Sequence, residues 1–188
     1  MPTVPDFRTG RLAAEHGSAV ILVRSPSFVL APILSPALLP SKPALHAACL
    51  AYVHTRLAAA RAGMAAAQES SNSETKSSAG DKYETGRAMA QQERDRHAAQ
   101  LHEAQQLLGA LHKINPELAS DTVRPGALAS TSLGLFYLSI SAGRLATAEG
   151  QAFMAVSAAA PLAVALHGRR AGEEVVFNGK PVRILAVS

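Results

Sequence analysis

The chain has 188 residues and a mass of 19.5 kDa, which is enough for one or two small domains. Aromatic residues make up only 4% of it and tryptophan is absent, which argues against a large aromatic-lined pocket. The formal net charge of +4 is spread as +2, +1 and +1 over residues 1–42, 43–115 and 116–188, so no segment carries the dense basic patch of a direct DNA-binding protein.

Residues 1–42 contain an apolar run, "AVILVRSPSFVLAPILSPALLP", that is interrupted by Arg24 and by Pro26, Pro32 and Pro36. These residues would make a poor membrane-spanning helix, because proline breaks helices and a charge is costly in lipid. A charged start before an apolar run is only a weak sign of a secretory signal, and no clean small-residue cleavage site follows. The sequence therefore predicts a disordered or loosely packed extension, with an overextended translation start or a cleaved signal as alternatives.

Residues 43–115 have the pattern of two long helices. Between Ala44 and Thr75 the chain has no proline and a single glycine, so its helix propensity is high. Apolar positions recur in steps of three and four, as in a heptad seam. The seam positions are Leu50, Val53, Leu57, Ala60, Met64 and Ala67, then His97, Leu101, Ala104, Leu108 and Leu111.

Two such helices, joined by a polar turn near 76–84 and stopped by Pro116, predict an antiparallel coiled-coil hairpin. Arms of about 30 residues would each be about 45 Å long. Neither arm has a third apolar face, so the hairpin is expected to project into solvent, with a dimerisation coiled coil as the alternative.

Cys49 is the single cysteine, which excludes an internal disulfide and fits a reducing compartment. We interpret it as a small apolar helix residue rather than a nucleophile.

The period changes in residues 118–188. "GLFYLSIS" (134–141) and "QAFMAVS" (151–157) predict strands because they are rich in aromatic and branched residues, and "SAGR" (141–144) resembles a turn. "PLAVALHG" (161–168) predicts a short helix, with proline at its start and glycine just past its end.

A second hairpin signal lies near the end of the chain. In "EEVVFNGKPVRILAV" the pair Asn178-Gly179 predicts two strands joined by a tight turn, and Pro181 places the second strand partly at a sheet edge. Several strands with one short helix make a small domain, so the predicted fold class is α+β.

Two acids, Asp81 and Glu84, stand three residues apart where the helical pattern restarts. "DKYE" matches a capping box, which contributes on the order of 1 kcal/mol to a helix. A carboxylate pair on a projecting arm has no pocket, histidine or third acid nearby with which to form its own enzyme site. Mg²⁺ often takes one or two protein carboxylates and keeps waters or phosphate oxygens. The tip could therefore complete the second metal site of a phosphoryl-transfer centre on another macromolecule, and an exposed cap can serve both purposes.

The architecture and two motifs resemble the Gre family of bacterial transcript-cleavage factors. The family's tip pattern, Gly-Asp-x-x-Glu, is present at Gly80–Glu84. Its C-terminal pattern, Ser/Ala-Pro-Leu-x-x-Ala-Leu-x-Gly-Lys-x-x-Gly-Asp/Glu-x-Val, is present as "APLAVALHGRRAGEEV" (160–175). The resemblance covers roughly residues 44–188 and implies a coiled-coil hairpin followed by an FKBP-like domain.

The resemblance also implies a function. The hairpin tip would enter the secondary channel of RNA polymerase, and Asp81 and Glu84 would hold Mg²⁺ jointly with the polymerase for cleavage of backtracked RNA. The protein would be an accessory factor and not an enzyme, a cytoplasmic monomer that meets nucleic acid only through the polymerase and has no membrane partner. The implied partner-binding residues are Pro161, Leu162, Leu166, Gly168, Arg169, Arg170 and Gly172.

Departures from the family pattern keep alternatives open. After the second acid the family usually has Asn-Ala-Glu-Tyr, whereas this chain has Thr85-Gly86-Arg87-Ala88, and Lys82 lies between the acids. The alternatives are a channel-binding regulator of the polymerase without cleavage activity and a coiled-coil interaction protein without a polymerase role.

An FKBP-like fold also raises the possibility of a prolyl isomerase, which would need an aromatic-lined pocket. The aromatic residues available for one are expected in the core; they are Phe136, Tyr137, Phe153 and Phe177.

Overall fold

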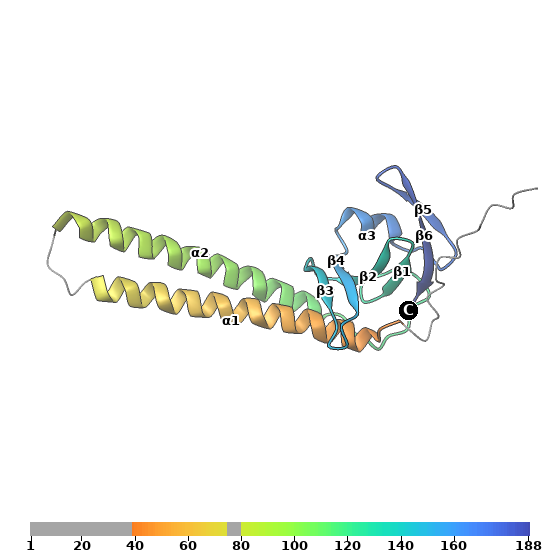
Figure 1. Ribbon diagram of the computed structural model, residues 1–188, viewed down its shortest axis with the longest axis horizontal. Coiled ribbons are helices and arrows are strands. Elements are labelled where there is room, and N and C mark those ends of the chain that lie inside the picture. Colours follow the sequence, from red (N-terminus) through yellow and green to blue (C-terminus); the bar gives the residue numbers. More distant parts are fainter. Residues whose placement is uncertain (1–38, 75–79) are drawn as a thin grey trace, which may run out of the picture. The chain divides into compact units, whose positions relative to one another are not determined.

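The computed structural model describes residues 39–74 and 80–188, without the side chains of residues 73–83. Two long helices come first in this part of the chain, α1 (Lys42–Glu74) and α2 (Gly80–His112). A six-stranded sheet and the short helix α3 (Pro161–Leu166) follow, which confirms the α+β fold class (Figure 1). The strands are β1 (Leu128–Thr131), β2 (Gly134–Ser139), β3 (Gly143–Ala146), β4 (Ala152–Ser157), β5 (Glu174–Phe177) and β6 (Lys180–Val187).

Residues 1–38 of the N-terminal extension, which the sequence predicts over residues 1–42, lie outside the described residues. Its last residues already belong to the folded part, since Pro40 is buried and Leu39 packs on a core cluster. Ser41 then starts α1: its side-chain oxygen accepts from the N–H of Ala44 at 3.4 Å, and its carbonyl accepts from the N–H of Leu45 at 3.2 Å.

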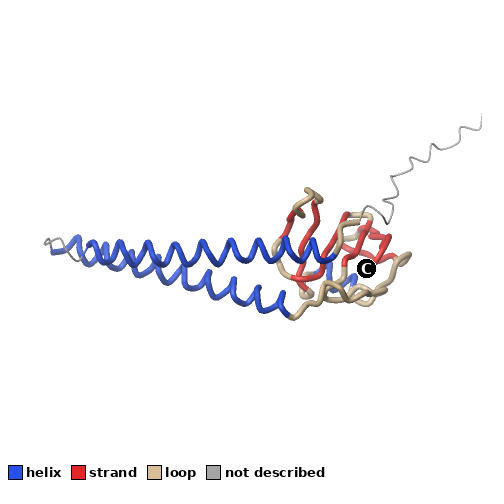
Figure 2. The backbone as a smooth tube through the Cα atoms, turned by 90° about the horizontal axis from the view of Figure 1, so that it is seen from below, coloured by secondary structure: helices blue, strands red, loops and turns tan. Residues whose placement is uncertain are grey.

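Helices α1 and α2 lie side by side and continue well beyond the sheet (Figures 1 and 2). Of the predicted seam, the small and central positions are buried, whereas Leu50, Met64, His97, Leu101 and Leu108 are half-buried. The buried seam positions are Val53, Leu57, Ala60, Ala67, Ala104 and Leu111.

The base of α1 carries apolar residues that the seam pattern missed. Leu45 and Cys49 are fully buried in a cluster with Leu128 and Tyr137 of the sheet. The expectation that neither arm has another apolar face is therefore wrong at the base, where α1 packs on the sheet as well as on α2. The same packing buries Cys49, which agrees with its interpretation from the sequence as a small apolar helix residue.

The strand order is β3-β4-β2-β1-β6-β5, with β2 and β4 parallel and the other neighbours antiparallel. Side chains alternate between two cores. On one face Leu128, Tyr137 and Phe153 pack with the hairpin base, and on the other Phe136 and Leu138 pack with α3. The sheet is thus covered by helix on both faces, which explains why β1 and the centre of β2 are continuously buried.

The turn chemistry near the end of the chain is confirmed. Asn178 and Gly179 have positive φ of 51° and 73° between β5 and β6, as a tight hairpin turn requires. Pro181 lies in the part of β6 that extends past β1, whose pairing with β6 begins at Ile184, so the proline is partly at an edge as predicted.

Two strands differ from expectation. The chain forms β1, which the sequence pattern missed, and the predicted turn at 141–144 ends inside β3, because Gly143 and Arg144 pair with β4.

No helix among the described residues has both the length and the apolar character needed to cross a bilayer.

Candidate functional site

The hairpin tip lies at the end of α2 farthest from the sheet (Figure 1). The helix begins at Gly80, so Asp81 and Glu84 are its second and fifth residues, and Asp81 is not at the N-cap position that the capping box predicts. The side chain of Asp81 lies outside the described residues, and Glu84 is exposed. The two positions are three residues apart on one helix, which places them one turn apart on the same side.

This placement suits a metal site that is shared with a partner. Among the described residues, no group of three or more His, Cys, Asp and Glu is arranged to hold a metal ion. The start of a helix favours negative charge, because the first N–H groups of a helix are unpaired and its dipole is positive there. Two carboxylates one turn apart can supply part of a Mg²⁺ shell and leave the remaining positions to other oxygens.

The second motif forms α3 and the loop behind it. Pro161 occupies the first turn of α3 and is exposed, whereas Leu162 and Leu166 are buried to 8% and 0% exposure against the sheet. These leucines hold α3 in place, so direct contact with a partner is left to the exposed members of the set. Those members are Pro161, Gly168, Arg169, Arg170 and Gly172.

The loop after α3 is tied to the rest of the domain by backbone hydrogen bonds. The N–H of Gly168 donates to the carbonyl of Val123 at 2.8 Å, and the N–H of Val123 donates to the carbonyl of Arg169 at 2.8 Å. The N–H of Gly172 donates to the carbonyl of Ile184 at 2.8 Å. Gly168 and Gly172 have positive φ of 74° and 90°, a conformation that favours glycine. The two glycines of the motif therefore shape the loop and fix its position.

This loop presents two arginines beside acidic residues. Arg169 lies 3.6 Å from Glu173, and Arg170 lies 3.9 Å from Asp121, with the arginine side chains 51% and 69% exposed. Glu173 also accepts a hydrogen bond from the N–H of Arg170 at 2.6 Å. Such exposed pairs hold their side chains weakly, so the guanidinium groups remain available to an acidic partner surface.

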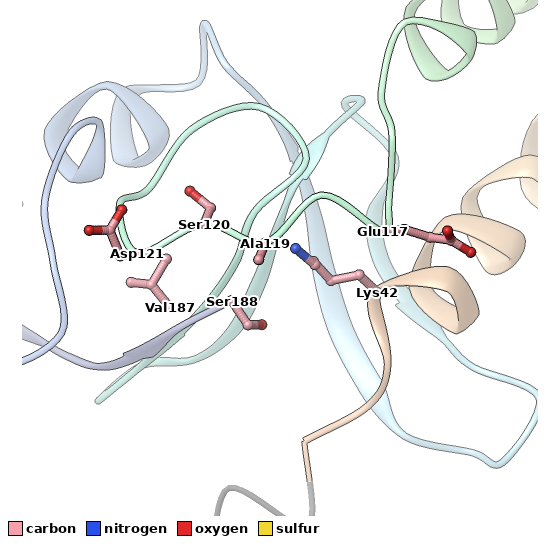
Figure 3. Close-up of a pocket in the computed structure, with 7 residues that line it drawn as sticks. All are labelled: Lys42, Glu117, Ala119, Ser120, Asp121, Val187 and Ser188. Carbon is pink, nitrogen blue, oxygen red and sulfur yellow. The ribbon is translucent and has the colours of Figure 1, made fainter.

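A separate open pocket of about 680 Å³ lies between the start of α1, the loop that follows α2 and the end of β6 (Figure 3). Lys42 points into it and donates to the carbonyl of Leu118 at 2.7 Å, whereas Glu117 and Asp121 point away from the lysine. Burial and the nearby Arg124 lower the pKa of Lys42. No nucleophile, base or metal-ligand set converges here among the described residues, so the pocket has no assignable chemistry.

The aromatic residues that a prolyl isomerase pocket would use are in the cores. Phe136, Tyr137 and Phe153 are at most 7% exposed, and Phe177 packs against the cluster under α3. Phe153 borders a cavity of about 310 Å³ at the start of β4, and none of the other three aromatics lines that cavity. An aromatic-lined pocket is therefore not formed by these four residues.

One polar cluster has no signal in the sequence. His46 of α1 contacts the hydroxyl of Tyr137, and Cys49 contacts Ser139, both across the junction of hairpin and sheet. Their separation of about ninety residues along the chain leaves no local pattern to find.

No model of a known protein family matches the sequence, and a search of curated proteins finds no significant relative.

Proposed function

We propose that this protein is a Gre-like transcription elongation factor that binds RNA polymerase and stimulates cleavage of backtracked RNA by the polymerase. The observation that carries the proposal is the position of Asp81 and Glu84 in the first turns of α2, at the end of the helix pair that is distant from the sheet. A helix of 33 residues extends about 50 Å, which suits insertion of a tip into a narrow channel.

The metal chemistry would be supplied by a Mg²⁺ ion shared with the polymerase. The residues of this chain that would hold it are Asp81 and Glu84, and the ion would lower the pKa of a bound water and stabilise charge on the phosphate. The contribution of this chain is to bring two carboxylates to the end of a stiff helical arm.

The polymerase contact would use the loop behind α3. Arg169 and Arg170 are more than half exposed on a loop whose backbone is held by hydrogen bonds to Val123 and Ile184. A positioned pair of arginines fits an acidic surface, because guanidinium groups bind carboxylates in a planar, two-pronged geometry.

The second candidate function is a channel-binding regulator without cleavage activity. The observation that favours it is the charge of the tip, because Lys82 and Arg87 lie beside the two acids in α2. The positive charges of these two side chains oppose the binding of a metal cation such as Mg²⁺ by the acids.

The test is RNA release from a stalled, backtracked elongation complex with wild-type protein and with Asp81→Ala/Glu84→Ala. We expect the wild type to accelerate cleavage and the double variant to fall to the rate of polymerase alone. Glu69→Ala is the matched control, since Glu69 is an exposed acid on the distal part of α1. Equal helicity by circular dichroism would show that all variants keep the hairpin.

Binding to the polymerase separates the remaining outcomes. If wild type and double variant both bind and neither stimulates cleavage, the regulator function replaces the cleavage function. If the wild type does not bind the polymerase, both proposals fail. Arg169→Ala/Arg170→Ala is expected to weaken binding without changing helicity, with Arg144→Ala, at an exposed position of β3, as its control.

A further inference from the structure

The junction between the hairpin base and the sheet contains a histidine–tyrosine pair. His46 Nδ1 lies 3.2 Å from Tyr137 Oη, and the two rings meet edge to face with centroids 6.4 Å apart. Tyr137 is fully buried in the cluster that joins α1 to the sheet, and its ring also meets Phe153 edge to face. The contact therefore lies where the two parts of the fold are held together.

The direction of this hydrogen bond depends on the protonation of His46. Neutral His46 with its proton on Nε2 can accept from the hydroxyl of Tyr137. Protonated His46 carries hydrogen on both nitrogens, so Nδ1 becomes a donor and the tyrosine proton must find another acceptor. Among the described residues, His46 Nδ1 is the one hydrogen-bond partner of Tyr137 Oη. Protonation would thus leave a buried O–H without an acceptor, which is unfavourable.

The charges around His46 act in the same direction. From α2 it faces His112, and on α1 Lys42 lies one turn before it, so these two neighbouring side chains are basic. The other titratable groups beside it are Cys49 on α1 and Tyr137 on β2, which are neutral at pH 7. No carboxylate of the described residues lies within ion-pair distance of its ring. Burial, followed by repulsion from His112, lowers the pKa of His46.

We propose that His46 and Tyr137 form a proton-sensitive latch, a contact that stabilises docking of the hairpin base on the sheet when His46 is neutral and weakens this docking when His46 is protonated. The latch would set how firmly the helical arm is fixed to the domain that carries it. The proposal concerns this chain alone and does not depend on the partner that the tip meets.

The sign of the pH dependence follows from linkage. The pKa of His46 is lowered in the docked state and returns to its ordinary value of about 6.5 when the base opens. The contribution of neutral His46 to the stability of the docked state is therefore fully present above about pH 6.5, and it is lost progressively as the pH falls below that value. Because opening takes up one proton, the ratio of open to docked molecules rises by at most about tenfold per pH unit.

The test is hydrogen exchange of amides in β2 and in the first turns of α1, corrected for intrinsic rates, between pH 7.5 and 5.5. We expect the opening constant of wild type to rise by several-fold to about tenfold below pH 6.5. His46→Asn should remove this rise, because its side-chain oxygen can accept near the position of Nδ1 and does not titrate. His54→Asn, at an exposed histidine two turns further along α1, should behave as wild type.

Identical slopes for wild type and His46→Asn would overturn the proposal. Should His46→Asn fail to fold, nitrogen NMR of His46 in the wild type decides the matter on the intact protein. The latch requires the Nε2–H tautomer and titration below the ordinary histidine range. An Nδ1–H tautomer, or titration at the value of an exposed histidine, would contradict it.

Discussion

The two halves of the helical hairpin are built from different residues. At the base, Leu45, Val53 and Leu111 are fully buried and share a cluster with the sheet. In the distal half the buried positions among the residues with described side chains are alanines, Ala60, Ala67 and Ala90, with 2–9% exposure. Because an alanine buries far less apolar area than a leucine, most of the hydrophobic stabilisation lies at the base. The arm therefore depends on its anchored end, and the distal half is free to carry function.

The largest expected effect is a cavity at the base. Leu111→Ala should lower the free energy of unfolding by about 3 kcal/mol, because a fully buried leucine is removed from a packed cluster. Met64→Ala, on the half-buried distal seam, should cost about 1 kcal/mol. Urea denaturation followed by circular dichroism measures both, and equal losses would refute the contrast between base and distal half.

The next expected effect is on the reactivity of the cysteine at the base. Burial raises the pKa of the Cys49 thiol, against a weaker opposite effect of its hydrogen bond to Ser139. The native protein should therefore react with a thiol reagent at pH 8 at least about tenfold more slowly than the urea-unfolded chain. Leu111→Ala should speed the reaction of the native protein, because it loosens the base in which Cys49 is buried. Met64→Ala should not, because it loosens only the distal seam. Rapid labelling of the native wild type would contradict a closed base.

A smaller effect is expected where the ring of His97 covers Gly63. A Cβ added at Gly63 would lie 2.4 Å from the ring of His97, whereas one added at Gly109 would meet no atom within 4 Å. Gly109→Ala should stabilise the protein by up to about 1 kcal/mol through helix propensity, and Gly63→Ala should gain at least about 1 kcal/mol less. Thermal unfolding measures both.

The partner of the clash provides the control for this comparison. His97→Ala in the Gly63→Ala background should recover the propensity gain, because the ring that blocks the new methyl group is removed. If Gly63→Ala is as stabilising as Gly109→Ala on its own, the ring of His97 moves aside without loss and close approach of the helices does not depend on the glycine.

Elements with a local chemical signal could be predicted from the sequence. The heptad seam, Pro161 at the start of α3 and the Asn178-Gly179 turn each act within a few residues, and each appears where expected. Strand β3 could not be predicted, because "GRLA" contains a glycine and its pairing is supplied by β4. The strand exists through its neighbour rather than through its own propensity.

The candidate site shows the same limit. Asp81 and Glu84 could be singled out because their spacing is local, and Leu162 and Leu166 because they stand in one contiguous sequence motif. The latch between His46 and Tyr137 joins residues from two elements that the fold alone brings together. The burial of Leu45 was missed for the same reason, since a heptad pattern describes contacts with the other helix and not with a sheet.

The smallest expected effect concerns an ion pair between the arms. Arg56 of α1 lies 2.9 Å from Glu103 of α2, with side chains 30% and 60% exposed, and its guanidinium also lies 5.9 Å from the ring centre of Tyr52. A double-mutant cycle with Arg56→Ala and Glu103→Gln should give a coupling energy of about 0.5 kcal/mol that fades in 1 M salt. Arg56→Ala alone should cost more than Glu103→Gln alone, because it also removes the contact with Tyr52 and the packing of its stem. A coupling above about 2 kcal/mol would mean that charge, and not base packing, holds the arms together.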